Sequence, residues 1–272
     1  MCGIIAAASN RNVGKLLVQG LHKMEYRGYD SAGIALHQND QIVHLRTLGK
    51  VRLLEDKMIA EKPKSKLGIA HTRWATHGEP SEENAHPHKS NERIYIVHNG
   101  IIENYLDLKE FLKNEGYTFS SQTDSELIAH MLEYFLAQGN NMIESMYLTK
   151  EKLEGAYAIA AIDREDNEKI IIARSKSPLL IGLGEDEHLA ASDPLAIAQL
   201  TNDFVFLEDG DVAEITAGGY SIFDQKQQKI EREVTHIDIS SQATSKGEYK
   251  HFMEKEIFEQ PEAVLNTIDG RV

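Results

Sequence analysis

The sequence is poor in cysteine, in basic residues and in long apolar runs. Its single cysteine excludes an intramolecular disulfide framework and a cysteine-clustered zinc site, and it fits a reducing, cytoplasmic setting. No apolar run reaches the roughly 18–20 residues that span a bilayer, and the N-terminus lacks the basic start and apolar core of a signal peptide. With 29 basic against 43 acidic residues, the 272-residue chain has a net charge of −14, so we expect no binding to nucleic acid or to an anionic membrane.

Apolar periodicity predicts strands and helices that come in blocks. Strands are predicted at 2–8, 32–37, 41–47, 67–72 and 93–98, and helices at 13–24, 51–58, 102–112, 127–135 and 142–153. From 156 to 234 the chain predicts a series of short strands, the last at 229–234, interrupted by one short helix at 194–200 that begins after Asp193-Pro194. Blocks rather than strict alternation favour an α+β fold of antiparallel sheets packed with helices.

Three connecting segments have distinctive patterns. The loop from Arg73 to Ser90 is longer than most, which is typical of functional or disordered loops. Thr123 and Glu126 match a capping box and predict the start of the helix at 127–135. Residues 236–250 predict a polar linker. A helix then follows at 251–260, where apolar side chains (Phe252, Met253, Ile257 and Phe258) look exposed, so we expect them to pack on a further domain or subunit.

Cys2 is a candidate nucleophile because it directly follows the initiator methionine. Removal of Met1 would place a thiol and a free α-amine on one residue. An α-amine has a pKa of about 7.7–8.0 and can accept and return a proton near neutral pH, while a thiolate is a strong nucleophile. The glycine that follows would let a substrate approach the backbone. The alternative is a small buried apolar residue, the commoner role of a lone cysteine.

The segment from His71 to Gly78 enters the long loop and carries further candidates. Arg73 has the planar fork that suits a carboxylate, although a surface ion pair is the alternative. Trp74, the one tryptophan, either covers part of a site or simply packs. Four histidines (His71, His77, His86 and His88) lack ligand spacing and an accompanying cysteine, so they predict structural hydrogen bonds rather than a metal site.

Asn99-Gly100 and Asp124 are the remaining candidates. Asn-Gly at the end of a strand is an ordinary turn signal, but an Asn amide and an unobstructed backbone N–H can also converge on a developing oxyanion. Asp124 lies in the first turn of its predicted helix, where a carboxylate stabilises the helix dipole. It could instead bind a substrate ammonium group. Together with Arg73 it would then hold an α-amino acid by both of its charged groups.

An ordered set of segments resembles the N-terminal glutaminase domains of the glucosamine-6-phosphate synthase family, the isomerising glutamine:fructose-6-phosphate amidotransferases. The set comprises Met1 to Ile4, Tyr26 to Gly33, His71 to Pro80, Asn84 to His88 and Val97 to Asn104, and it continues through Asp124, Gly155 to Tyr157, Ala173 to Ser175, Ser192-Asp193, Lys246 to Tyr249 and Lys255 to Pro261. Related amidotransferases of purine and asparagine synthesis are not similar over His71 to His88. Nearly the whole chain is covered by this resemblance.

The resemblance implies an N-terminal-nucleophile hydrolase fold, a four-layer αββα sandwich. It implies a class II glutamine amidotransferase domain at 1–240, then a linker and the start of a sugar-isomerase region at 241–272. Carried over to this sequence, the catalytic residues would be Cys2, Asn99 and Gly100, and the residues binding L-glutamine would be Arg73, Thr76, His77 and Asp124, with Trp74 gating an ammonia path. No cofactor or metal is implied.

The resemblance also implies partner domains, and it implies that glutamine hydrolysis and sugar amination take place in different domains. Sugar-isomerase domains that bind fructose 6-phosphate would receive the ammonia in the full-length enzyme, which would be a homodimer serving amino-sugar synthesis. The chain alone would hydrolyse glutamine through a Cys2 thioester and make no glucosamine 6-phosphate. Two alternatives stay open: another N-terminal-cysteine amide hydrolase, or a non-catalytic assembly module in which Cys2 only packs.

Overall fold

The computed structural model describes residues 2–238, 249 and 252–268. The chain divides into two compact units, Met1–Ile237 and Asp238–Val272. The first unit contains both sheets and every candidate site residue. The second contains helix α6 (Phe252–Ile268). Most of the linker predicted at 236–250 lies outside the described residues.

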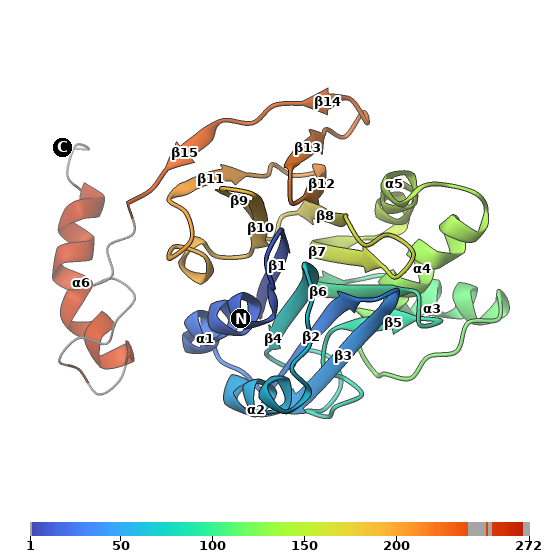
Figure 1. The fold of residues 1–272 in the computed structure, drawn as a ribbon, viewed down its shortest axis with the longest axis horizontal. Helices are drawn as coiled ribbons and strands as arrows, with labels where there is room; N and C mark the ends of the chain where they lie inside the picture. The colour runs from blue at the N-terminus through green and yellow to red at the C-terminus, as the bar shows by residue number, and fades with distance from the viewer. Residues whose placement is uncertain (1, 239–248, 250–251, 269–272) are drawn as a thin grey trace. The chain divides into compact units, whose positions relative to one another are not determined.

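Two antiparallel sheets form the centre of the first unit (Figure 1). In the described part of the chain, one sheet has eight strands in the order β15-β11-β9-β10-β1-β4-β2-β3 and the other has seven in the order β14-β13-β12-β8-β7-β6-β5. The first consists of β1 (Gly3–Ser9), β2 (Ser31–Gln38), β3 (Gln41–Leu48), β4 (Leu67–Arg73), β9 (Leu180–Gly184), β10 (Glu187–Ala191), β11 (Asp203–Phe206) and β15 (Val234–His236). The second consists of β5 (His88–Ser90), β6 (Ile94–Ile102), β7 (Gly155–Asp163), β8 (Ile170–Ser175), β12 (Val212–Thr216), β13 (Gly219–Phe223) and β14 (Lys229–Ile230).

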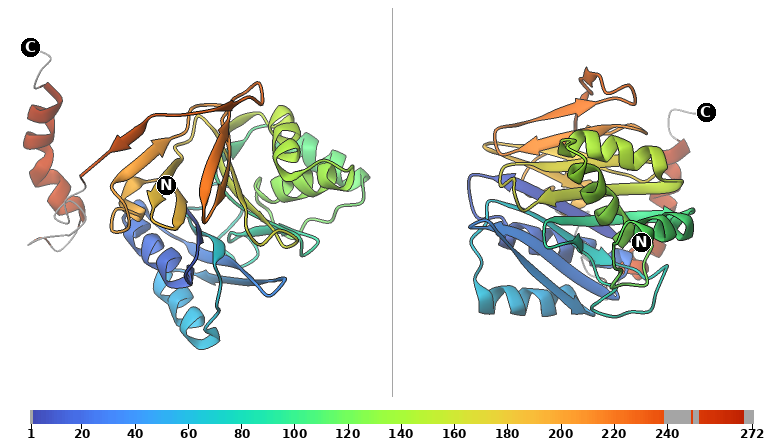
Figure 2. Two further views of the ribbon diagram at one scale, coloured as in Figure 1. Left: turned by 45° about the horizontal axis from the view of Figure 1, so that its top comes forward. Right: turned by 90° about the vertical axis from the view of Figure 1, so that its right-hand side faces the viewer.

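Helices cover the outer face of each sheet. Helices α1 (Gly14–Met24) and α2 (Val51–Glu61) pack on the first sheet, and α4 (Glu126–Ala137) and α5 (Met142–Lys152) pack on the second, with α3 (Tyr105–Asn114) beside α4. Figures 1 and 2 show the two helical groups on opposite sides of the paired sheets. The four layers are therefore αββα, which confirms the α+β sandwich that the sequence predicts.

The core is divided between the layers by strand alternation. In β4, Leu67 and Ile69 lie in the cluster between the sheets, and in β6 Tyr95 and Val97 lie in the same cluster. The intervening β6 residues contribute to a second cluster with α4 and α5. Because side chains alternate between the two faces of a strand, residues at every second position further along β4 and β6 also point between the sheets.

Several sequence predictions need correction at element boundaries. The helix expected at 102–112 is α3, Tyr105–Asn114, because β6 continues through Ile102 and pairs with β7 along its length. The helix expected at 194–200 is only a 3₁₀ turn, Pro194–Ala196. The strand expected at 229–234 is divided between β14 and β15, which belong to different sheets. Asn99-Gly100 therefore lies inside a strand and not in a turn.

The capping box predicted at Thr123 and Glu126 is wrong. The helix N-cap is Ser125, and its side chain makes no capping bond. The Glu126 carboxylate instead accepts hydrogen bonds from the backbone N–H groups of Ser120 and Ser121, at 2.8 and 2.7 Å. Thr123 Oγ1 accepts from the Ser125 N–H at 3.3 Å. The buried Glu126 therefore holds the segment that precedes helix α4 against the first turn of that helix.

Helix α6 has the exposed apolar side chains that the sequence predicts. Met253, Ile257 and Phe258 are 71%, 58% and 66% exposed, while the side chain of Phe252 lies outside the described residues. The helix also runs further than expected, to Ile268. None of the helices described has both the length and the apolar composition needed to cross a membrane.

Candidate active site

The candidate residues converge because three strand ends meet at one edge of the sandwich. Gly3 at the start of β1 pairs with Thr72 near the end of β4, so Cys2 lies next to Arg73. Ser31 at the start of β2 pairs with Arg73 from the other side. Strand β6 of the second sheet contributes Asn99. Antiparallel pairing thus brings the beginning of one strand beside the end of its neighbour.

A cavity of about 380 Å³ opens at this edge. All eight site residues predicted from the sequence line it: Cys2, Arg73, Trp74, Thr76, His77, Asn99, Gly100 and Asp124. Arg27, His86, His98, Thr123, Ser125 and Ser177 are among the other lining residues. The cavity therefore combines a thiol, amide donors and charges of both signs.

The Cys2 thiol lies against the backbone of Trp74. Its Sγ accepts a hydrogen bond from the Trp74 N–H at 3.2 Å and lies 3.5 Å from the Trp74 carbonyl oxygen, to which the thiol can donate. Burial raises the pKa of the Cys2 thiol, and the Trp74 N–H opposes that shift. A group that takes the proton is therefore needed to form the thiolate near neutral pH.

Asn99 and Gly100 belong to β6 of the second sheet, and Asn99 contacts Cys2 of the first. Asn99 Nδ2 donates to the Cys2 carbonyl oxygen at 3.3 Å. Gly100 has φ +134°, and a Cβ there would lie 1.9 Å from the Ala156 carbonyl oxygen. No other residue type fits this position without moving strand β7, so close pairing of β6 with β7 requires glycine beside Asn99.

Arg73 is buried and supports the long loop, so it is not the surface ion pair that the sequence left open. Its guanidinium donates to the carbonyl oxygens of His77, Gly78 and Glu79 at 2.6, 2.9 and 3.3 Å. Asp30 lies 3.5 Å away and also accepts a hydrogen bond from the Ala75 N–H. The Arg73–Asp30 pair therefore fixes the first turn of the loop beside Cys2.

The indole of Trp74 lies over Gly28, at the mouth of the cavity. Trp74 is 53% exposed, so it is not a core residue. A Cβ on Gly28, which has φ +96°, would come within 1.9 Å of the indole. Only glycine lets the ring lie this close to the backbone.

Asp124 points from the start of α4 toward the end of β6. Its Oδ2 accepts a hydrogen bond from the Ile102 N–H at 2.8 Å, and Ser125 Oγ lies 3.4 Å from Oδ1. His98 Nδ1 is 2.8 Å from Ser125 Oγ. The carboxylate is only 3% exposed and is held by these neighbours, with Oδ1 less tightly bonded than Oδ2.

Buried histidines form the wall behind the cavity. The rings of His71 and His86 are 4.1 Å apart between centroids, and those of His86 and His88 are 4.5 Å apart. Burial lowers the pKa of His71 and of His88 to about 3, and it also lowers the pKa of His86 well below its usual value. His71 and His88 make side-chain hydrogen bonds, to Asn99 Oδ1 at 2.9 Å and to Thr123 Oγ1 at 3.0 Å. These two fit the structural role predicted for them, whereas neither ring nitrogen of His86 has a partner.

Sequence reasoning missed two charged residues near the cavity. Arg27 lines it and pairs with Asp193 at 2.5 Å, and Asp30 pairs with Arg73. Both lie in the Tyr26 to Gly33 segment, which the family resemblance includes but the spacing of polar residues alone did not single out. The available signal was the pair of opposite charges, Arg27 and Asp30, close to Gly28 in a segment that breaks the preceding helical period.

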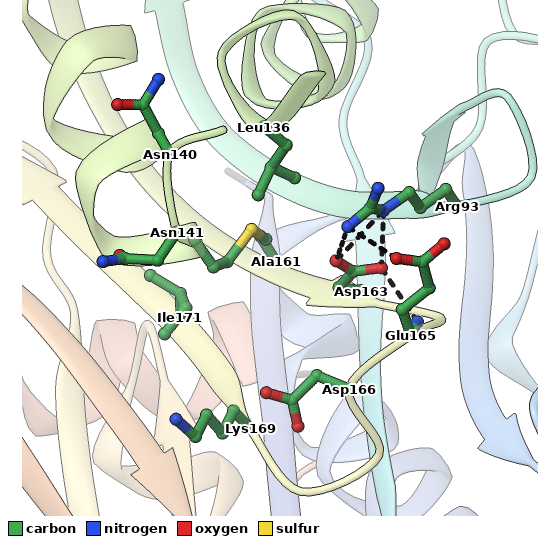
Figure 3. A pocket seen from close by; sticks show the side chains of 11 residues that line it. Arg93, Leu136, Asn140, Asn141, Ala161, Asp163, Glu165, Asp166, Lys169 and Ile171 are labelled. Atoms are coloured by element: carbon green, nitrogen blue, oxygen red, sulfur yellow. Dashed lines mark hydrogen bonds and ion pairs between the residues drawn. The ribbon is translucent and has the colours of Figure 1, made fainter. Parts of the chain in front are cut away.

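A second cavity, of about 280 Å³, has none of this chemistry (Figure 3). Arg93 lies between Asp163 and Glu165, at 2.9 Å from each carboxylate, and Lys169 pairs with Glu214 at 3.1 Å. Both cations of this cavity, Arg93 and Lys169, are thus already paired with carboxylates. Of the described residues that line it, none is a nucleophile of the kind found beside Asn99.

Comparisons with known proteins point to glutamine amidotransferases. Residues 71–199 match the family model described as a glutamine amidotransferase domain. The whole chain is 50% identical to glutamine–fructose-6-phosphate aminotransferase [isomerizing] from Vibrio parahaemolyticus and from Shewanella oneidensis, and it spans 45% of the length of each.

Solved structures share the fold. Glutamine phosphoribosylpyrophosphate amidotransferase from B. subtilis superposes with a TM-score of 0.72 at 24% identity, over 84% of this chain and 50% of that one. A glutamine aminotransferase class-II domain protein from Silicibacter pomeroyi superposes with a TM-score of 0.56 at 13% identity, over 82% and 99%. The chain therefore has the N-terminal-nucleophile amidotransferase fold and belongs to the glutamine amidotransferase domains of the glutamine–fructose-6-phosphate aminotransferase family.

Proposed function

We propose that this chain hydrolyses L-glutamine to glutamate and ammonia, with the Cys2 thiol as nucleophile. The observation that carries the proposal is the meeting of Cys2, Asn99 and the opposite charges of Arg73 and Asp124 in one cavity. This reaction needs a thiol, an amide donor beside it and a site for an α-amino acid. Removal of Met1 would supply the fourth group, the α-amine of Cys2.

The reaction proceeds through a thioester. The α-amine of processed Cys2 takes the thiol proton, and Sγ attacks the side-chain amide carbon of glutamine. Asn99 Nδ2 and the Gly100 N–H stabilise the oxyanion, and such a donor is worth about 2.7–4 kcal/mol in the transition state. The carbon–nitrogen bond breaks as the α-ammonium returns the proton to the leaving ammonia. Water then attacks the γ-glutamyl thioester, releasing glutamate and the thiol.

Charge complementarity supports the orientation of the substrate. The Arg73 guanidinium would bind the α-carboxylate, and Asp124 the α-ammonium, with Thr76 and His77 lining the same side. Arg73 now donates to three loop carbonyls, so a carboxylate would share or replace these bonds. Binding of glutamine would therefore be coupled to the position of residues 77–79.

The family supports a role within a larger enzyme. We propose that ammonia passes Trp74 to sugar-isomerase domains that bind fructose 6-phosphate and convert it to glucosamine 6-phosphate. In this arrangement residues 1–240 are the glutaminase domain, 241–272 connect it to the isomerase region, and the full-length enzyme is a homodimer. The relatives' names, which join glutamine to fructose 6-phosphate, support this assignment.

We expect the 272-residue chain to release glutamate from glutamine but to form no glucosamine 6-phosphate when fructose 6-phosphate is added, because the family site for the sugar lies in another region. Coupled glutamate detection and sugar analysis on the same sample measure both products. Aminated sugar from this chain would contradict the assignment of sugar amination to another region. Absence of glutamate would contradict the proposed glutaminase activity. A glutamine analogue with an electrophilic side chain would label Cys2 in a glutaminase but not in a broad acylase. Retained Met1, together with unchanged glutamine turnover in Cys2→Ala, would favour a non-catalytic assembly module.

Asp124→Asn is expected to raise the KM for glutamine by about 100-fold, because it removes the buried charge opposite the substrate ammonium while an amide oxygen can still accept from the Ile102 N–H. Steady-state glutaminase assays measure the effect. The matched control is Asp163→Asn, the same change beside Arg93 in the second cavity (Figure 3). An unchanged KM in Asp124→Asn would contradict the role of this carboxylate.

A further inference from the structure

The hydrogen bond between His71 and Asn99 joins the two sheets behind the nucleophile. His71 Nε2 lies 2.9 Å from Asn99 Oδ1. His71 belongs to β4 in the eight-stranded sheet, and Asn99 belongs to β6 in the seven-stranded sheet. Each continues an inward-facing apolar stripe, after Ile69 in β4 and after Val97 in β6. An apolar side chain would therefore be expected at position 71 if packing were its only role.

The orientation of the Asn99 amide follows from its two partners. The Cys2 carbonyl oxygen can only accept, so the amide nitrogen of Asn99 must face it, at 3.3 Å. The amide oxygen then faces His71, and that oxygen can only accept. His71 must therefore carry its proton on Nε2. Of the two hydrogens on Asn99 Nδ2, one is used by the Cys2 carbonyl and the other is left for the oxyanion.

Burial keeps the His71 ring in its neutral form. His71 is fully buried, and burial lowers the pKa of its ring to about 3, so the imidazole is neutral near pH 7. The ring of His86 lies against it, with the two ring centroids 4.1 Å apart. Without the Nε2–H donor, rotation of the Asn99 amide by 180° would direct its oxygen, an acceptor, toward the reacting centre.

We infer that His71 is a positioning residue of the glutaminase site, whose Nε2–H group holds the Asn99 amide with its NH₂ group toward Cys2. The inference rests on the proposed function and deepens it. His71 touches neither the substrate nor the thiol in this account, and it acts only through Asn99. Because an oxyanion donor acts mainly in the transition state, loss of its positioning affects kcat and leaves KM nearly unchanged.

The test compares two isosteric replacements. The amide nitrogen of His71→Gln falls near the Nε2 position and can donate to Asn99, whereas that of His71→Asn falls near the Nδ1 position and cannot reach it. We expect His71→Asn to lower kcat by about 10- to 100-fold with KM for glutamine within about twofold of wild type, and His71→Gln to restore most of the loss. Equal kcat values in the two variants would overturn the inference. If both variants lost activity equally, the loss would indicate a packing role for His71.

A double-mutant comparison separates positioning from general damage. Asn99→Ala alone should lower kcat more than His71→Asn, and adding His71→Asn to Asn99→Ala should cause almost no further loss. Additive losses would overturn the inference. The matched control is His37→Asn, another buried strand histidine, which bonds only the Arg164 carbonyl oxygen at 2.7 Å and should leave kcat unchanged. If wild type itself releases no glutamate, the proposed function fails; if wild type is active and His71→Asn matches it, only this inference fails.

Discussion

Replacing Cys2 by alanine is expected to reduce glutamate release by at least about a thousandfold, because no other group can take over the covalent step. Cys2 is the one cysteine of the sequence, so no second thiol can substitute for it. Alanine keeps a small residue behind Met1 and leaves the α-amine available after processing. Glutamate production by purified wild type and variant, normalised to protein, measures the loss.

The fold should survive this substitution. Cys2 precedes β1, and the pairing of β1 with β4 and β10 begins at Gly3 and Ile5. We therefore expect the unfolding midpoint of Cys2→Ala to stay close to that of wild type, which excludes loss of activity through unfolding. Residual activity within tenfold of wild type would contradict a Cys2 thioester and would favour packing as the role of this residue.

Acidification from pH 7 to pH 5 is expected to destabilise the fold by several kcal/mol. Burial lowers the pKa of His44 to about 4 and of His71 and His88 to about 3, and it lowers the pKa of His86 and His98 as well. In the unfolded chain a histidine has a pKa of about 6.5. Between that value and about 4, the unfolded chain binds protons that the folded chain does not. Stability is therefore complete above pH 6.5 and falls as the pH falls, by about 1.4 kcal/mol per pH unit for each such histidine.

Urea unfolding at pH 7.5, 6 and 5 and constant ionic strength measures this slope. His71→Gln removes one titrating group and should reduce the slope by about 1.4 kcal/mol per pH unit. A free energy of unfolding that is flat between pH 7 and 5, or that rises on acidification, would show that these rings are not kept neutral by the fold. Activity is not the readout here, so the test does not depend on the glutaminase assignment.

The chemistry of single residues, together with the family resemblance, made much of the site predictable from the sequence. Arg73 was a candidate because its planar fork suits a carboxylate. The position of Cys2 behind Met1 was likewise a local signal. Both signals depend only on neighbours along the chain, which is why they could be found without the fold.

Features that depend on long-range pairing were not predictable in the same way. Asn99-Gly100 has the composition of a turn, but pairing of β6 with β7 carries the strand three positions beyond Asn99. Glu126 matches a capping residue, but the backbone N–H groups of Ser120 and Ser121 bind it instead. The bond between His71 and Asn99 joins residues 28 positions apart in two sheets. In each case a tertiary contact outweighed the local preference.

The central claim is that one processed residue supplies both the nucleophile and the proton carrier, and intact mass measured with activity on the same sample tests it most directly. The protein is treated with a glutamine analogue that carries an electrophilic side chain, and glutamate release is followed in parallel. We predict a mass that lacks Met1 and gains one analogue per chain, located on Cys2, with activity lost in proportion to labelling. Full activity in protein that retains Met1, or in which the α-amine of Cys2 is acetylated, would contradict the claim.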